Sequence, residues 1–339
     1  MRIQHQFLLY YSLFLLFLTA TTLISPSHGD LGKCHPSDFK ALMNMKNSIS
    51  MSEGEYSSWF QNTDCCDWNG IRCDSKTNRI GGIYLFIGEL SGQIPPSVGD
   101  LSHLTALTIR HFKNITGPIP QSITKLKHLQ VLDLDHMSLS GPVPHFLNQL
   151  TLLTRLDLSG NQFSGSIPPN LSDLKNIISI HLDGNKLTGS IPESFEKFTG
   201  TVLDLYLGRN KLTGRVPKYL GALDGAIDLS RNKLIGDASF LINPNHTYID
   251  LSRNEFEFDL SKVKFPKDLN IFDISHNKIF GGIPDEIKNL ESLYTLKVGY
   301  NRLCGKIPTG GIMKRFKSTS FFHNKCLCGT PMMISCKKN

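Results

Sequence analysis

The chain has 339 residues, of which 40% are hydrophobic and 19% charged, so it can build a substantial core and is no disordered polyelectrolyte. Its formal net charge of +7 favours polyanionic partners without requiring nucleic acid, and we expect no nucleic-acid partner. The eight cysteines lie four near each end of the chain, with none between residues 74 and 303. This distribution predicts an elongated molecule with cross-linked ends rather than two globular domains.

Residues 1–29 are typical of a secretory signal peptide. Arg2 provides a basic start, the stretch from Phe7 to Ala20 is almost entirely apolar, and Ser27-His28-Gly29 offers a small-x-small cleavage pattern. A membrane anchor is the alternative, but the apolar run is shorter than the about 20 residues that a span requires. No later window is long and apolar enough to cross a bilayer. We therefore expect a secreted, extracellular protein without a membrane span.

Residues 30–79 are predicted to form an N-terminal cap. A helix is expected to begin at Ser37-Asp38, because these residues precede apolar positions at helical spacing. Trp59 and Trp68 are then available to cover the first coil of the following segment. The apolar face of the helix comprises Phe39, Leu42, Met45 and Ile49.

Residues 80–308 contain ten copies of the motif apolar-x-apolar-x-x-Asn-x-apolar-x-Gly-x-Ile-Pro, and residues 156–168 are a clear copy. Nine intervals span 213 residues, a mean of 23.7, which is the period of a leucine-rich repeat. Stacked coils of this kind form a solenoid with a continuous parallel sheet on its concave face. The first apolar positions of the ten copies are Ile83, Leu107, Leu132, Leu156, Ile180, Leu205, Ile227, Ile249, Phe272 and Leu296.

An asparagine follows the strand in most copies, where its amide can bond backbone groups that would otherwise be buried unpaired. The first three copies carry Gly88, Phe112 and Met137 instead, which predicts a less regular start. Copies seven and eight lack the Ile-Pro, which predicts a narrower convex side there. The predicted asparagine ladder comprises Asn161, Asn185, Asn210, Asn232, Asn254, Asn277 and Asn301.

Residues 309–339 are predicted to form a C-terminal cap, so that both ends of the solenoid are closed by disulfides. Four cysteines allow three pairings at each end, and a bond between the adjacent Cys65 and Cys66 would be strained. A zinc site is not expected, because the cysteine spacing is wrong, and no cofactor is expected either. Three sequons start at Asn114, Asn170 and Asn245. The predicted disulfides are Cys34–Cys65, Cys66–Cys73, Cys304–Cys326 and Cys328–Cys336.

These features together resemble the plant polygalacturonase-inhibiting proteins over the whole mature chain. The resemblance rests on the cap pattern Cys65-Cys66-x-Trp68-x-Gly70-Ile71-x-Cys73, on the Leu-x-Gly-x-Ile-Pro repeats and on the C-terminal Cys326-Leu327-Cys328-Gly329. It implies an α/β leucine-rich repeat solenoid with a second, shorter sheet beside the concave one. It also implies a cell-wall protein that binds fungal or insect endopolygalacturonases and blocks pectin cleavage. We expect a monomer.

Outward strand positions provide the candidate binding residues on the concave face. The resemblance implies that acids matching Asp157, Asp183 and Asp228 contact the enzyme, and that Arg209, Arg231 and Arg253 bind pectin. Cations in line at strand spacing suit an anionic polymer on physical grounds as well. The alternative is that these charges recur by repeat duplication and only solvate the face. We extend the predicted enzyme-binding face to Asp133, His181, Tyr206, Asp250 and Asp273.

Catalysis is not expected, although Asp228, Asp250 and Asp273 lie on neighbouring strands. An open, regular sheet is expected to offer no pocket that raises the pKa of one acid above the others. His111 and His136 are expected to stack, without a third ligand for a metal. Two alternatives to inhibition stay open, a developmental or receptor-ectodomain partner and ice binding, and the charged, varied strand rows disfavour the second.

Overall fold

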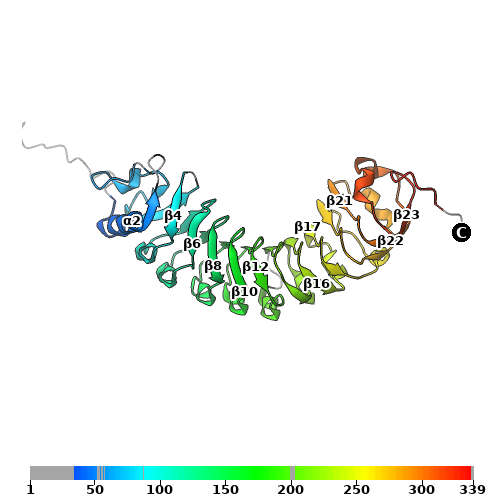
Figure 1. Ribbon diagram of the computed structural model, residues 1–339, viewed down its shortest axis with the longest axis horizontal. Helices are drawn as coiled ribbons and strands as arrows, with labels where there is room; N and C mark the ends of the chain where they lie inside the picture. Colours follow the sequence, from blue (N-terminus) through cyan, green and yellow to red (C-terminus); the bar gives the residue numbers. More distant parts are fainter. Residues whose placement is uncertain are drawn as a thin grey trace, which may run out of the picture.

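The computed structural model describes residues 34–336 except 52–53, 55, 57, 87 and 199–202. The predicted signal peptide lies outside the described residues. The rest is one curved solenoid that runs from the N-terminal cap to the C-terminal cap (Figure 1). No helix in the part of the chain that the structure describes has the length and apolarity to cross a bilayer.

One strand from each of the ten repeats joins the concave sheet, as predicted, and a cap strand pairs antiparallel with the first of them. All other neighbours in this sheet are parallel, as with Leu132 beside Leu156, and the register shifts between Gly225 and Ala226. The strands are β2 (Ile71–Cys73), β3 (Ile80–Leu85), β5 (Ala106–Ile109), β7 (Val131–Asp133), β9 (Arg155–Asp157), β11 (Ser179–His181), β13 (Asp204–Tyr206), β15 (Gly225–Asp228), β17 (His246–Asp250), β19 (Ile271–Asp273) and β21 (Thr295–Lys297).

The second sheet that the resemblance implied is present, in three separate pieces. Its first piece comprises β1 (Ile49–Met51), β4 (Leu90–Gln93), β6 (Asn114–Gly117), β8 (Ser138–Pro142), β10 (Gln162–Ser166) and β12 (Lys186–Thr188). The second comprises β14 (Thr213–Arg215), β16 (Lys233–Gly236) and β18 (Glu255–Phe256). The third comprises β20 (Phe280–Gly281), β22 (Arg302–Lys306) and β23 (Cys326–Cys328).

Short 3-10 turns close the convex side. The turns of the repeats without Ile-Pro, Ser239–Leu241 and Leu260–Lys262, have three residues, whereas the others in the repeats have five or six, so the convex side is shorter there. The longer turns are Pro96–Asp100, Gln121–Lys125, His145–Gln149, Pro169–Asp173, Glu193–Phe198, Lys218–Ala222 and Asp285–Asn289. The caps add Cys65–Asp67, Gly311–Arg315 and Ser318–Ser320.

The asparagine ladder is confirmed, and each rung joins two coils. Nδ2 of Asn161 donates to the carbonyls of Leu134 (2.7 Å) and Leu158 (3.1 Å), and its Oδ1 accepts from the Leu139 N–H (3.0 Å). Asn324 in the C-terminal cap forms a further rung that the repeat pattern missed. Phe112 and Met137 replace the amide in the early coils with buried apolar side chains.

Both caps close the core. Helix α2 (Pro36–Ser48) forms as expected, but Ile49 begins β1, so the prediction that Ile49 lies on the helix is wrong. Trp59 and Trp68 are buried and stacked, with ring centroids 5.2 Å apart. Buried Asp38 accepts hydrogen bonds from Arg79 (2.9 and 3.0 Å) and from the Ile80 N–H. All four predicted disulfides are confirmed, and the described residues contain no free cysteine.

Candidate functional site

The concave face is built from side chains that leave each strand away from the core. The predicted outward acids do lie there, but neighbouring strands are only about 4.8 Å apart, so their side chains cover one another. Asp157 keeps 2% of its surface exposed, and Asp133 and Asp273 keep 5% each. The face is therefore a packed polar layer in which the acids differ in exposure, and our expectation of a row of equivalent acids is wrong.

In the N-terminal half of this face, three buried acids have arginine or histidine neighbours. Arg110 bonds Asp135 (2.8 Å) and lies 3.7 Å from Asp133. Arg155 bonds Asp157 at 2.8 Å, and His181 Nδ1 lies 3.3 Å from the same carboxylate. Two arginines and one histidine thus face three buried acids, and neither arginine is left unpaired. Oδ1 of Asp133 and Oδ1 of Asp135 nevertheless have no hydrogen-bond partner in the described part of the chain.

Two acids in this half differ sharply in their proton affinity. Burial, and then the charge of Asp157, raise the pKa of Asp133 to about 6. Burial also disfavours the charged form of Asp157, but hydrogen bonds from His181 and Ser159 outweigh it and hold the pKa of Asp157 below its ordinary value. The packing of each acid, rather than its place in the repeat, decides its pKa.

In the C-terminal half, the face is hollowed to a volume of about 400 Å³. The carboxylates of Asp228, Asp250 and Asp273 lie along it, each accepting a hydrogen bond from the N–H of the serine two residues on. Lys297 pairs with Asp273 at 3.2 Å. We predicted that the sheet offers no pocket that raises the pKa of one acid above the others. That prediction is wrong, because the hollow is present and burial raises the pKa of Asp228 and raises that of Asp250 to about 6.

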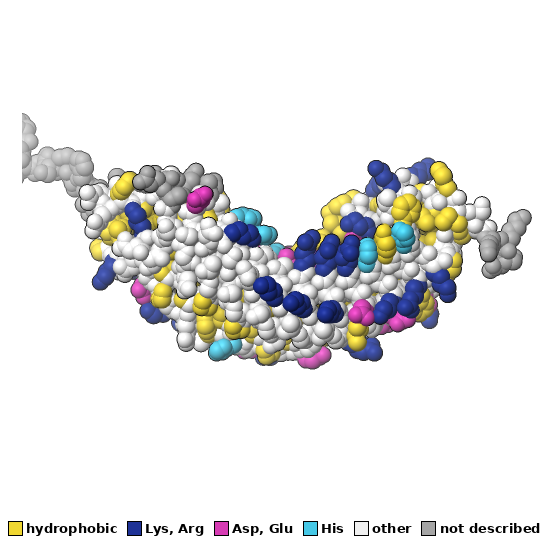
Figure 2. Space-filling view, viewed as in Figure 1, with side chains coloured by type: hydrophobic (Ala, Val, Ile, Leu, Met, Phe, Trp, Pro, Cys, Tyr) yellow, Lys and Arg dark blue, Asp and Glu magenta, His cyan; other side chains and the backbone are white. Residues whose placement is uncertain are grey.

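Arg209, Arg231 and Arg253 line the same hollow and form the arginine row. Unlike Arg110 and Arg155, they form no ion pair within the described part of the chain. Figure 2 shows lysine and arginine side chains clustered at the rim of the concavity. Three unpaired guanidinium groups beside an acid-lined hollow give this half free positive charge, which the paired arginines of the N-terminal half do not offer.

The arginine row occupies strained backbone. Arg209, Arg231 and Arg253 have φ between 52° and 55°, in the left-handed region. Each backbone N–H donates to a carbonyl of the next coil, at 2.7 to 2.8 Å, which fixes this conformation. A non-glycine residue there costs of the order of 1–3 kcal/mol. Gly160 and Gly184 adopt it at the equivalent positions of earlier coils.

An aromatic group links the two halves of the face. The rings of His181 and Tyr206 are 4.4 Å apart, and those of Tyr206 and Tyr248 are 5.8 Å apart. The last contact spans β15, where Ala226 pairs with Tyr248 and is small enough to leave room. Tyr248 and Arg155 were not among our predicted residues. The sequence did contain a signal for them. Side chains alternate along each strand, so the residue two positions before each predicted outward acid also points outward.

Comparison with known proteins decides the family. Residues 35–74 match the leucine rich repeat N-terminal domain, and residues 128–150, 152–174, 176–198 and 268–290 match the Leucine Rich Repeat. Polygalacturonase inhibitor 2 of Arabidopsis thaliana is 50% identical over 95% of this chain and 98% of its own length. The polygalacturonase inhibitor of Vitis vinifera is 48% identical over 98% of each chain. The chain belongs to the polygalacturonase-inhibitor family.

A solved structure agrees with this family fold. The crystal structure of a plant ice-binding protein aligns with a TM-score of 0.85 and 44% identity, over 90% of this inhibitor-family chain and 99% of that one. Family membership supports the prediction that the chain is a leucine-rich repeat binding protein and not an enzyme.

The two histidines near the start of the face do have a third potential ligand, contrary to our expectation. His111 and His136 have ring centroids 4.9 Å apart, and ligand atoms of both lie within 4.8 Å of one on Asp135. Asp135 is already bonded by Arg110, however, and a guanidinium at this position repels a metal ion. The three side chains therefore lie close enough to share a ligand, but the nearby guanidinium disfavours a cation, and we do not propose a metal site.

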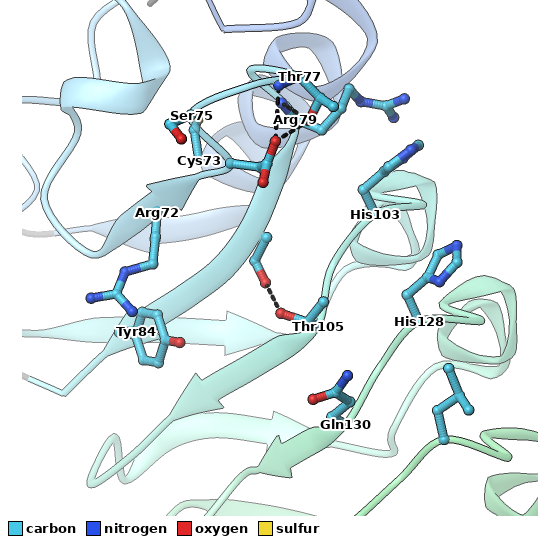
Figure 3. A pocket seen from close by; sticks show the side chains of 13 residues that line it. Arg72, Cys73, Ser75, Thr77, Arg79, Tyr84, His103, Thr105, His128 and Gln130 are labelled. Carbon is cyan, nitrogen blue, oxygen red and sulfur yellow. Dashed lines mark hydrogen bonds between the residues drawn. The ribbon is translucent and has the colours of Figure 1, made fainter.

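A second hollow, of about 740 Å³, lies between the N-terminal cap and the first repeats (Figure 3). Arg72 lies over the Tyr84 ring at 5.8 Å, and the His103 and His128 rings are 5.9 Å apart. None of the predicted enzyme-binding or pectin-binding residues lines it. The repeat pattern could not reveal it, because it forms where the antiparallel cap strand β2 joins the regular sheet.

Replacing Asp250 with asparagine is expected to stabilise this inhibitor-family protein near pH 7.5 by up to about 3 kcal/mol. The raised pKa of Asp250 means that the folded state binds the proton more tightly than the unfolded state does. The wild type therefore loses stability as pH rises from about 4 through 6, and D250N removes that loss. Urea denaturation at pH 4 and 7.5 measures it. Equal effects at both pH values would contradict the assignment, and D273N, whose acid is paired with Lys297, is the matched control.

Proposed function

We propose that the protein inhibits fungal or insect endopolygalacturonases by docking them on its concave face. An enzyme that holds polygalacturonate needs a cationic cleft, and the carboxylates of Asp228 and Asp250 in the hollow complement cations of such a cleft. The observation that carries the proposal is the hollow itself, in which Asp228 and Asp250 have no ion-pair partner within the described residues. The names of the relatives point to the same activity.

We also propose that the protein binds pectin through the arginine row. A linear polyanion can lie along cations that repeat once per coil, at intervals of about 5 Å. The acids of the hollow do not neutralise these guanidinium groups by direct ion pairs. Enzyme and pectin would then use adjacent parts of one face.

We also propose that the protein is secreted and located in the cell wall. The four disulfides suit an oxidising compartment, and residues 1–29 are predicted to direct export. Asn114 and Asn245 are exposed and accessible for glycosylation. Nδ2 of Asn170, the atom that a glycan modifies, already donates to the His145 carbonyl at 2.8 Å. We therefore propose Asn114 and Asn245 as the occupied sites.

Substituting Tyr206 with alanine tests the docking face. Tyrosines at the centre of an interface often carry much of the binding energy, and Tyr206 lies between His181 and Tyr248 in the middle of this one. We expect a loss of inhibition of about tenfold or more, measured as the release of reducing ends from polygalacturonic acid. Y294A is the control, because Tyr294 is 65% exposed and precedes β21 rather than lying in the concave rows.

Equal inhibition by Y206A and the wild type would refute docking at this position. The receptor-ectodomain alternative would gain support if the wild type inhibited no enzyme and recovered only a receptor ectodomain from plant tissue.

A further inference from the structure

The row of left-handed positions does not end with the arginines. His276, Tyr300 and His323 continue it in the next coils and the C-terminal cap, with φ of 59°, 58° and 57°. Backbone hydrogen bonds between coils again fix the geometry, from His276 N–H to the Gly299 carbonyl and from Tyr300 N–H to the Phe322 carbonyl. A ring at these positions is strained where glycine would not be, and strained residues cluster at functional sites.

The three rings form one stack, which we call the aromatic segment. The His276 and Tyr300 rings are 4.0 Å apart and nearly parallel at 12°, and the Tyr300 and His323 rings are 4.3 Å apart at 29°. The stack places two imidazoles and one phenol directly beyond the arginine row. Figure 2 shows histidine and hydrophobic side chains following the basic cluster along the same rim.

Two of the three rings are available to a ligand. Tyr300 is 46% exposed and His323 is exposed. Nδ1 of His276 is buried and has no hydrogen-bond partner in the described part of the chain, although His276 lines the acid-lined hollow beside the arginine row. The exposed phenol of Tyr300 and imidazole of His323, directly beyond three unpaired cations, are suited to carboxylates and hydroxyls of the same polymer.

We propose that the arginine row and the aromatic segment form one track of six positions for a linear polygalacturonate chain. The track spans five inter-coil intervals, about 24 Å at strand spacing. The arginines hold the carboxylates of one part of the chain, and the aromatic segment holds the sugars beyond them. This inference rests on the proposed pectin binding and extends it to residues outside the basic row.

The proposal gives the track a pH dependence of defined sign. Imidazoles gain a proton and a positive charge in mildly acidic solution, which strengthens binding of a polyanion. His276 is faced by Arg253 and Arg231 along the row, by Asp273 of its own coil and by His323 beyond Tyr300. Burial, and then Arg253, lower the pKa of His276, so an arriving carboxylate favours its protonation.

Isothermal titration with trigalacturonic and hexagalacturonic acid tests the track. The variant H276N/Y300N/H323N removes all three rings, and asparagine tolerates left-handed backbone, so the fold is kept. We expect it to bind the hexamer about tenfold more weakly than the wild type and the trimer nearly as well. We also expect it to lose part of the gain in hexamer affinity between about pH 7.5 and 5.5. M333N is the matched control, because Met333 is left-handed and fully exposed away from the row.

The possible results separate the two proposals. Unchanged hexamer affinity in H276N/Y300N/H323N, with loss of binding in R209N/R231N/R253N, would refute the aromatic segment and leave pectin binding at the arginine row intact. Equal losses for trimer and hexamer in the aromatic variant would also refute an extended track. Absence of binding of either oligomer by the wild type would refute the proposed pectin binding itself.

Discussion

Replacing Asn185 with leucine is expected to lower the free energy of unfolding by about 2 to 4 kcal/mol. The side chain is buried, donates to the carbonyls of Leu158 (2.9 Å) and Leu182 (3.0 Å), and accepts from the Phe163 N–H (3.0 Å). Leucine keeps the volume but leaves the buried Phe163 N–H unpaired, at about 1–3 kcal/mol. It also takes one of two amide donors from each carbonyl, which keeps a bond to the asparagine of a neighbouring rung at 3.1 or 2.9 Å. Because each coil contacts only its neighbours, a broken rung in the middle also weakens the coupling between the two halves.

Urea denaturation followed by circular dichroism measures this effect. The matched control is N176L, because Asn176 also donates to a carbonyl of the preceding coil, that of Thr151 (2.8 Å), but is exposed to water. We expect the control to stay within about 1 kcal/mol of the wild type. A similarly small effect of N185L would show that the ladder does not hold the coils together.

Removing the arginine row is expected to weaken polygalacturonate binding by about tenfold or more at low salt. R209Q/R231Q/R253Q deletes three unpaired cations, and each contact with a polyanion is screened by added salt. The variant should therefore also show a shallower dependence of affinity on salt concentration. Retention on a polygalacturonate column over a series of salt concentrations measures both effects.

A matched triple variant separates position from net charge. K186Q/K211Q/K233Q removes the same total charge from exposed lysines on or beside β12, β14 and β16 of the second sheet. We expect it to keep most of the affinity. Equal losses in the two variants would mean that the overall charge of +7, rather than the arginine row, retains the polymer.

The periodic features of the fold could be predicted from the sequence because each follows from one coil. The spacing of the apolar residues places β9 and β11 side by side. The asparagine after each strand bonds the same backbone groups in every coil that has one, namely carbonyls at its own and the preceding strand and an N–H of the preceding coil. Asn324 was missed because it lies in the C-terminal cap, after the last copy of the repeat motif, where the repeat spacing no longer predicts the position of an asparagine.

The energetics of the concave face depend on contacts between coils, which the repeat pattern does not encode. Asp133 and Asp157 occupy the same motif position, yet one pKa is raised to about 6 and the other is lowered. The difference comes from His181 and Ser159, which donate to Asp157 alone. The hollow beside Asp250 likewise forms from neighbouring coils, so it could be found only in three dimensions.

The most direct test of the central claim is a dose series of the secreted protein against a panel of fungal and insect endopolygalacturonases, with reducing-end release from polygalacturonic acid as the readout. The account predicts saturable inhibition of at least one enzyme, with a complex of the two proteins detectable in a separate binding assay. A panel in which no enzyme is inhibited and none binds would contradict it.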